Sequence, residues 1–297
     1  MTSEITLFVN PTAGRGRGAH AAQPAASALR DAGFSVRTVL GEDADDALRR
    51  AREAVGAGTG ALIAVGGDGM ASLALQAVAG TTTPLGVVAV GTGNDFARAL
   101  GLPVRDPAAA GRLAARALKE GHVRDIDLGR VGERWFGSVL ASGFDSRVND
   151  RGNRMPWGGR FRYDLAILAE LAAFKPIPYR IRLDGGAVRE VEATLIAVGN
   201  GSTYGGGMRI CADAVMDDGL FDVTVVGDCS RATLLKVFPR VYKGTHLSHP
   251  KVTAYRVSSI ELVAAGVTAY ADGEPLGALP LTATSVPGAV RVLCPEN

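Results

Sequence analysis

Three apolar runs of strand length near the start of the chain each lead directly into a glycine-rich turn. They read LFVN-PTAGRGRG at 7–18, LIAV-GGDG at 62–69 and VVAV-GTGNDF at 87–96, and helix-like sequence follows each turn. In a parallel sheet such turns emerge together at the carboxyl edge, where the following helices point free backbone N–H groups into the crevice. The pattern therefore predicts a site for an anionic ligand such as a phosphate.

The surrounding sequence supports this sheet. Apolar runs at 5–9, 35–39, 61–65 and 85–90 alternate with helical stretches. One stretch, 47–55, has apolar residues at helical spacing after a cluster of aspartates, which suit the positive end of a helix dipole. Strands that alternate with helices indicate a parallel sheet covered on both faces. We therefore expect residues 1–125 to form an α/β domain.

Beyond residue 125 the pattern changes to short strands separated by turns such as DGG at 184–186. The expected strands are 180–183, 188–198, 220–226, 255–263 and 267–271. A helical apolar face at 161–172, ended by Pro176, interrupts them. We expect residues 126–297 to form an antiparallel β-sandwich, with the cleft between the two domains as the binding site.

Composition excludes several classes of protein. Lys and Arg number 32 against 30 Asp and Glu, and this balance argues against a nucleic-acid-binding protein. The start of the chain lacks a basic segment followed by a long apolar one, and no window approaches the ~20 apolar residues that span a bilayer. A cytoplasmic protein is expected. The three cysteines and four histidines show no metal-binding spacing, which favours reduced thiols.

Each glycine turn alone is ambiguous. Gly14, Gly16 and Ala19 fit the dinucleotide fingerprint, but Asn10-Pro11 separates the strand from these glycines and disfavours an ordinary Rossmann site. The sequence has no G-x-x-x-x-G-K-[ST] motif, which excludes a Walker-type site. The glycines could also serve only to make tight turns, a reading that is weaker for three turns than for one.

The polar residues in these turns have two readings. Asp68 could face a phosphate-bound Mg²⁺ or could cap a helix. Thr92, Asn94 and Asp95 could bind phosphate, metal and water, or could cap the helix that follows them. Spacing alone leaves both readings open.

Taken in order, the motifs resemble those of the bacterial diacylglycerol kinase family. These soluble lipid kinases are related to sphingosine kinases and, more distantly, to NAD kinases and phosphofructokinases. The matching segments are NPTAG at 10–14, GGDG at 66–69, PLG at 84–86, GTGNDFAR at 91–98, DDGLFD at 217–222 and DGE at 272–274. The resemblance thus covers nearly the whole chain.

The resemblance implies transfer of the ATP γ-phosphoryl group to the hydroxyl of a diacylglycerol-like lipid, giving phosphatidic acid. It also implies an NAD kinase-like first domain, to which the last strand, about 286–297, returns. The implied partners are ATP, the lipid and, transiently, the inner face of the membrane, with a homodimer as a further possibility. The implied cofactor is Mg²⁺.

Site residues follow from the same resemblance. Glu274 would be the base that accepts the lipid hydroxyl proton, while Asp68 and Asp95 would act on the catalytic Mg²⁺ directly or through water. A structural Mg²⁺ would be held by Asp218 and the backbone carbonyls of Val215 and Leu220. The implied ATP contacts are Asn10, Pro11, Thr12, Ala13, Gly14, Gly66, Gly67, Asp68, Gly69, Met70, Ala71, Ser72, Thr92 and Asn94.

The chain departs from the family where Met70 and Leu73 replace a usual Thr and Glu, and where Gly41 replaces a frequent Thr. Two alternatives therefore stay open: a kinase of a soluble metabolite such as NAD, and a non-catalytic nucleotide or lipid binder. For membrane contact, the segment 151–162 carries four arginines around Trp157. That segment could equally be an exposed loop with Trp157 packed beneath it.

Overall fold

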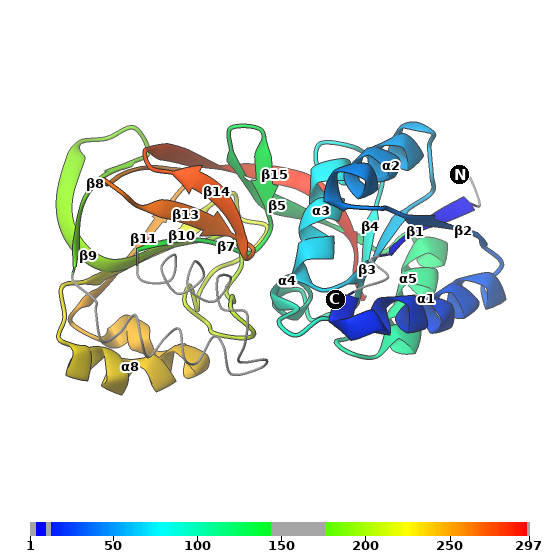
Figure 1. The fold of residues 1–297 in the computed structure, drawn as a ribbon, viewed down its shortest axis with the longest axis horizontal. Helices are drawn as coiled ribbons and strands as arrows, with labels where there is room; N and C mark the ends of the chain where they lie inside the picture. Colours follow the sequence, from blue (N-terminus) through cyan, green and yellow to red (C-terminus); the bar gives the residue numbers. More distant parts are fainter. Residues whose placement is uncertain (1–3, 10–12, 144–175, 296–297) are drawn as a thin grey trace.

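The computed structural model describes residues 4–9, 13–143 and 176–295 of the chain (Figure 1). An N-terminal α/β domain with a parallel sheet is followed by a C-terminal antiparallel β-sandwich, which confirms the predicted fold class. No helix in these described ranges is long and apolar enough to cross a membrane.

The N-terminal domain alternates strands and helices. Its elements are β1 (Glu4–Val9), α1 (Ala13–Asp31), β2 (Ser35–Leu40), α2 (Ala44–Gly56), β3 (Leu62–Gly66), α3 (Asp68–Val78), β4 (Leu85–Ala89), α4 (Asp95–Ala99) and α5 (Pro107–Glu120). The strands pair in parallel in the order β4-β3-β1-β2. On β3, Leu62 and Ala64 pack with α2 and α3, whereas Ile63 and Val65 pack with α1 and α5. Burial on both faces explains why this strand is continuously apolar.

Polar caps fix where two of these helices begin. The Asp43 carboxylate accepts a hydrogen bond of 2.8 Å from the Asp46 amide at the start of α2. Asp106 accepts one of 2.9 Å from the Ala109 amide at the start of α5, whose first residue is Pro107. Such caps satisfy amides that have no partner within the helix.

The C-terminal domain is mainly strands. Its elements are β5 (Val123–Val131), β6 (Arg134–Phe136), β7 (Val139–Gly143), β8 (Ile177–Leu183), β9 (Val188–Gly199), β10 (Phe221–Gly227), α8 (Arg231–Lys243), η2 (Thr245–Ser248), β11 (Val252–Val257), β12 (Ser259–Val263), β13 (Thr268–Ala271), β14 (Glu274–Ala278) and β15 (Leu281–Leu293). β9 pairs antiparallel with β7, β8 and β10. The core of this domain includes Phe136 and Phe221, whose rings stack with centroids 5.7 Å apart.

Two expectations for this half need correction. The run 255–263 is not one strand, because the Asp184 carboxylate accepts from the amide and hydroxyl of Ser258, which lies between β11 and β12. β11 then pairs with β10, and β12 pairs with β8 and β15. Helix α8 was not expected at all. The helix expected at 161–172 lies outside the described residues.

β15 connects the two halves of the sheet. It pairs antiparallel with β5 and β12, and near its end Val292 lies beside Leu85 of β4 in parallel register. Val292 and Leu293 are buried in the two core clusters of the N-terminal domain. Figure 1 shows this strand passing from one domain into the other. The strand therefore joins the sheets of the two domains.

Candidate active site

Two of the glycine turns pack against each other, backbone to backbone. Gly67 precedes α3 and Gly91 follows β4. A Cβ atom at Gly91 would lie 2.5 Å from the Gly67 Cα, and one at Gly67 would lie 3.1 Å from the Gly91 Cα. The first distance is too short for a real side chain and the second is tight, so Gly91 in particular is needed for this close approach.

Asp68 ties the second glycine turn to the third. Its carboxylate accepts hydrogen bonds of 2.7 Å each from the amides of Asn94 and Asp95. It therefore caps the N-terminus of α4, a helix distant in the sequence, and not the start of its own helix. The capping alternative is thus present in the structure, and it holds the half-buried carboxylate at the edge of the sheet.

Asn94 shapes the third turn. It has φ 58°, a left-handed conformation that asparagine tolerates. Its side-chain oxygen accepts from the Gly91 amide at 2.9 Å and its side-chain nitrogen donates to the Gly91 carbonyl at 3.0 Å. The side chain is 2% exposed, so it serves the loop itself. Thr92 beside it is exposed, as a ligand contact requires.

Asp95 joins the third turn to the C-terminal domain. Its carboxylate accepts hydrogen bonds of 2.8 Å each from the amides of Gly206 and Gly207. Both glycines have positive φ, 87° and 111°, which lets two successive amides point at one carboxylate. Asp95 is 6% exposed. Burial raises its pKa to about 6, and the Asp68 charge acts in the same direction, while the two amides oppose the shift.

A fourth turn, from the C-terminal domain, adds Asp272 and Glu274. The Asp272 carboxylate accepts from the amides of Gly137 and Ser138 at 2.7 and 2.9 Å. Desolvation raises the pKa of Asp272 to about 6, and the negative charge of Asp68 contributes to the shift. Glu274 begins β14 and is exposed, and its Oε1 would lie 3.7 Å from a Cβ atom on Gly69. Glu274 therefore faces the first turn of α3 across the domain boundary.

The structure thus brings together three acidic residues that the sequence singled out, Asp68, Asp95 and Glu274. Gly93 lies between the first two, because a Cβ atom there would be 2.5 Å from Asp68 Oδ2 and 3.1 Å from Asp95 Oδ2. Sequence reasoning missed Asp272 as a site residue and missed the glycine run at 205–207 that binds Asp95. Three successive glycines were a signal for a special backbone, although nothing local linked them to Asp95.

The carboxylates suit Mg²⁺ only when it is shared with another ligand. Among the described residues no three His, Cys, Asp or Glu side chains are placed to surround one metal ion. Mg²⁺ is usually held by one or two carboxylates together with waters and substrate phosphates. Asp68 and Asp95 supply such hard oxygen donors, and the Asp68 charge contributes to the raised pKa of Asp95. The donor set therefore fits a metal that arrives with a phosphate.

The residues expected to hold a structural Mg²⁺ are arranged differently. Asp218 makes an ion pair with Arg256 through one oxygen, and its other oxygen accepts from the Leu220 amide at 3.0 Å. Arg256 also lies 3.8 Å from Asp222. The positive charge beside Asp218 is thus that of Arg256. Val215 is exposed. Arg256 therefore occupies one oxygen of Asp218, and the structural Mg²⁺ stays an untested prediction.

Other expected ATP contacts vary in what they can offer. Asn10, Pro11 and Thr12 lie outside the described residues, and Ala13 and Gly14 begin α1. The side chains of Met70 and Ala71 are buried in the core between α3 and the sheet, so only their backbone is available to a ligand. Ser72 is half-buried and Gly66 ends β3. Met70, which stands where the family usually has Thr, therefore packs in the core.

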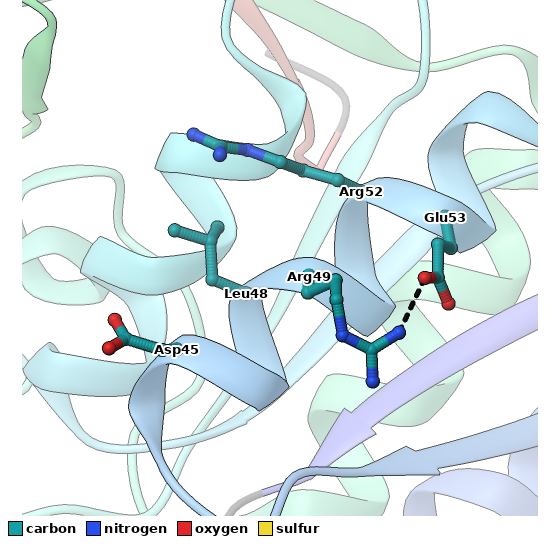
Figure 2. A pocket seen from close by; sticks show the side chains of 5 residues that line it. All are labelled: Asp45, Leu48, Arg49, Arg52 and Glu53. Atoms are coloured by element: carbon teal, nitrogen blue, oxygen red, sulfur yellow. Dashed lines mark hydrogen bonds and ion pairs between the residues drawn. The ribbon is translucent and has the colours of Figure 1, made fainter.

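A pocket on α2 is unrelated to this cluster. Its lining, drawn in Figure 2, is Asp45, Leu48, Arg49, Arg52 and Glu53. Arg49 bonds Glu53 at 2.5 Å, so the charges within the pocket are partly neutralised. None of the clustered carboxylates lines it.

The raised pKa of Asp95 predicts an unusual pH dependence of stability in the absence of ligand. The folded state binds a proton at Asp95 with a pKa of about 6, against 3.8 when unfolded. Proton binding at Asp95 therefore stabilises the folded state. This stabilisation is fully present below pH 3.8 and is lost as the pH rises through about 6. When the pH falls from 7 to 5, the free energy of unfolding of the wild type should rise by about 1 kcal/mol more than that of Asp95→Asn. Urea unfolding of both proteins at the two pH values, with chelator, measures the difference, and equal gains would contradict the prediction.

The chain shares its fold with solved kinases. It superimposes on a diacylglycerol kinase from Bacillus anthracis str. Sterne with a TM-score of 0.75, at 23% identity over 99% of this chain and 97% of that one. It superimposes on an NAD kinase from Archaeoglobus fulgidus in complex with ATP with a TM-score of 0.58, at 16% identity over 99% of this chain and 94% of that one. The chain thus has the two-domain fold of these solved kinases, with carboxylates beside the glycine turns.

Comparison of sequences then identifies the family. The family model of the diacylglycerol kinase catalytic domain matches residues 4–131, and that of the YegS C-terminal NAD kinase beta sandwich-like domain matches residues 138–294. A diacylglycerol kinase of Mycobacterium tuberculosis (strain H37Rv) is 42% identical over 99% of this chain and 96% of the relative. A probable YegS-like lipid kinase of Pseudomonas fluorescens is 33% identical over 92% and 90%. The chain belongs to the diacylglycerol kinase family.

Proposed function

We propose that this protein is a lipid kinase that transfers the γ-phosphoryl group of ATP to the hydroxyl of diacylglycerol or a related lipid, giving phosphatidic acid. The observation that carries the proposal is the approach of Glu274 to Gly69 in the first turn of α3. A helix N-terminus attracts phosphate, and an exposed carboxylate opposite it can accept a proton from a hydroxyl group. The names of the relatives support a lipid as the acceptor.

In the proposed reaction the lipid oxygen attacks the γ-phosphorus while Glu274 takes the hydroxyl proton. A bond forms from the lipid oxygen to phosphorus, and the bond from phosphorus to the β–γ bridging oxygen breaks, so that ADP leaves with the electron pair. Catalysis of this kind depends mainly on alignment and charge neutralisation. Asp68 and Asp95 would hold Mg²⁺ directly or through water, and the bound ion would neutralise phosphate charge.

Hydrogen bonds between the turns align the parts of the proposed site. Asp68 fixes the third glycine turn relative to the second through the Asn94 and Asp95 amides, and Asp95 fixes both relative to the C-terminal domain. Because Glu274 comes from that second domain, these bonds hold the base in register with the phosphate turns. The Asp272 bonds to Gly137 and Ser138 support the turn on which Glu274 sits.

Labelled ATP with Mg²⁺ should be offered in parallel with micellar diacylglycerol, sphingosine, ceramide and NAD. We expect label to appear in phosphatidic acid and not in the other products. Label in phosphorylated NAD alone would establish the soluble-metabolite alternative, and tight ATP binding without turnover on any lipid would establish a non-catalytic binder. We propose that the reaction takes place in the cytoplasm at the inner face of the membrane, where such a lipid is available.

A further inference from the structure

Helix α8 packs on the C-terminal domain through little of its surface. It begins after Ser230, whose side chain accepts from the Thr233 amide at 3.2 Å, and ends at Gly244 in the left-handed region. Only Val241 is fully buried along its length, and Phe238 packs beside it on the cluster around β7 and β9. Figure 1 shows the helix along the lower edge of that domain. Seven of its 13 residues are exposed.

The outward side of α8 is apolar as well as basic. The residues of this exposed face, spaced by three or four along the helix, are Arg231, Ala232, Leu235, Lys236, Pro239, Tyr242 and Lys243. Leu235 is 55% exposed and Tyr242 51%, more than any other large apolar side chain that the structure describes. Leu235, Pro239 and Tyr242 follow one another at spacings of four and three residues, so they form a row of apolar side chains along one face of the helix.

The charge of α8 is all of one sign. The helix contains four Lys and Arg residues and no Asp or Glu. Arg240 is engaged by the Thr245 carbonyl and the Ser248 hydroxyl, but Arg231, Lys236 and Lys243 make no ion pair within the described part of the chain. By contrast, the arginines Arg49 and Arg50 of α2 are paired with acidic neighbours on their own helix. Among the described residues, no ion pair therefore neutralises the positive charge of Arg231, Lys236 and Lys243.

We propose that the exposed face of α8 docks on the surface of an anionic phospholipid bilayer. Leucine and tyrosine side chains suit the boundary between headgroups and acyl chains, and lysines beside them can extend their charged ends to lipid phosphates. The absence of any acidic side chain on the helix removes the repulsion that such a surface would otherwise exert. The inference rests on the proposed function in one respect, namely that the substrate lies in a bilayer.

The test is co-sedimentation of the full chain with vesicles. Wild type should bind vesicles rich in phosphatidylglycerol, bind pure phosphatidylcholine weakly, and be released by high salt. Each Lys near such a surface contributes about 5-fold to partitioning, so a Lys236→Gln, Lys243→Gln double variant should lose about 30-fold. Leu235→Ser should lose about tenfold, and this loss should persist at high salt. An Arg116→Gln, Lys119→Gln variant removes two exposed charges from α5 and should bind as wild type does.

Two readouts separate this inference from the proposed function. Phosphorylation of a short-chain, water-soluble diacylglycerol should be unchanged in the α8 variants, whereas phosphorylation of diacylglycerol in anionic vesicles should fall with binding. Equal binding by wild type and the double variant, or equal losses in the α5 control, would overturn the inference even if the kinase is active. A change in oligomeric state in place of vesicle binding, seen by sedimentation velocity, would also overturn it. Conversely, α8-dependent binding without any kinase activity would refute only the proposed function.

Discussion

Replacing Glu274 by Gln should lower the rate of phosphatidic acid formation by about 10²- to 10⁴-fold, the usual contribution of a general base. Gln keeps the size of the side chain and removes the proton acceptor. Glu274 is exposed, so the melting temperature and the affinity for ATP should stay close to those of wild type. The measurement is the initial rate at saturating ATP and micellar diacylglycerol.

The control for this variant is Glu190→Gln. Glu190 is also an exposed glutamate of the C-terminal domain, on β9, and its replacement removes the same charge. It should leave the rate unchanged. Full phosphatidic acid formation by Glu274→Gln would show that another group accepts the proton, whereas weaker ATP binding with an unchanged rate would assign Glu274 to nucleotide binding.

Gly91→Ala should damage both stability and nucleotide binding. The added Cβ atom would lie 2.5 Å from the Gly67 Cα. Movement of the third turn would disturb the Asn94 bonds to Gly91, and movement of the second would disturb the Asp68 bonds to the Asn94 and Asp95 amides. Overpacking of this kind costs about 1–3 kcal/mol of unfolding free energy. We also expect ATP affinity to fall at least tenfold, because both turns would be displaced. Urea unfolding and calorimetric titration with ATP measure the two effects.

Gly56→Ala provides the matched control, because a Cβ atom at Gly56 would meet nothing within 4 Å. Gly56 ends α2, and alanine there should be neutral or stabilising by up to about 1 kcal/mol. If Gly91→Ala unfolded at the same urea concentration as Gly56→Ala, the tight contact between the two glycine turns would not be a feature of the protein in solution.

The α/β half was predictable because its signals are local. Leu62 to Val65 are apolar without interruption since both faces of β3 are covered, and the aspartates before α2 mark its start. The β-rich half was less predictable from the sequence. Its strand near 255–263 is divided by hydrogen bonds from Ser258 to Asp184, a partner far away in the sequence. α8 was missed although its apolar residues recur at helical spacing, and Pro239 within the run disfavours a helix.

By itself the sequence indicated the order of strands and helices in the α/β half, the glycine turns that follow its strands and, by resemblance, the candidate base Glu274. The tertiary structure alone decided how the acidic side chains meet. Asp95 is bound by Gly206 and Gly207, and Asp272 by Gly137 and Ser138, across separations of more than 100 residues. The physical reason is that periodicity reports which face of an element is buried, whereas hydrogen bonds between distant segments depend on where the packed sheets bring their backbone amides.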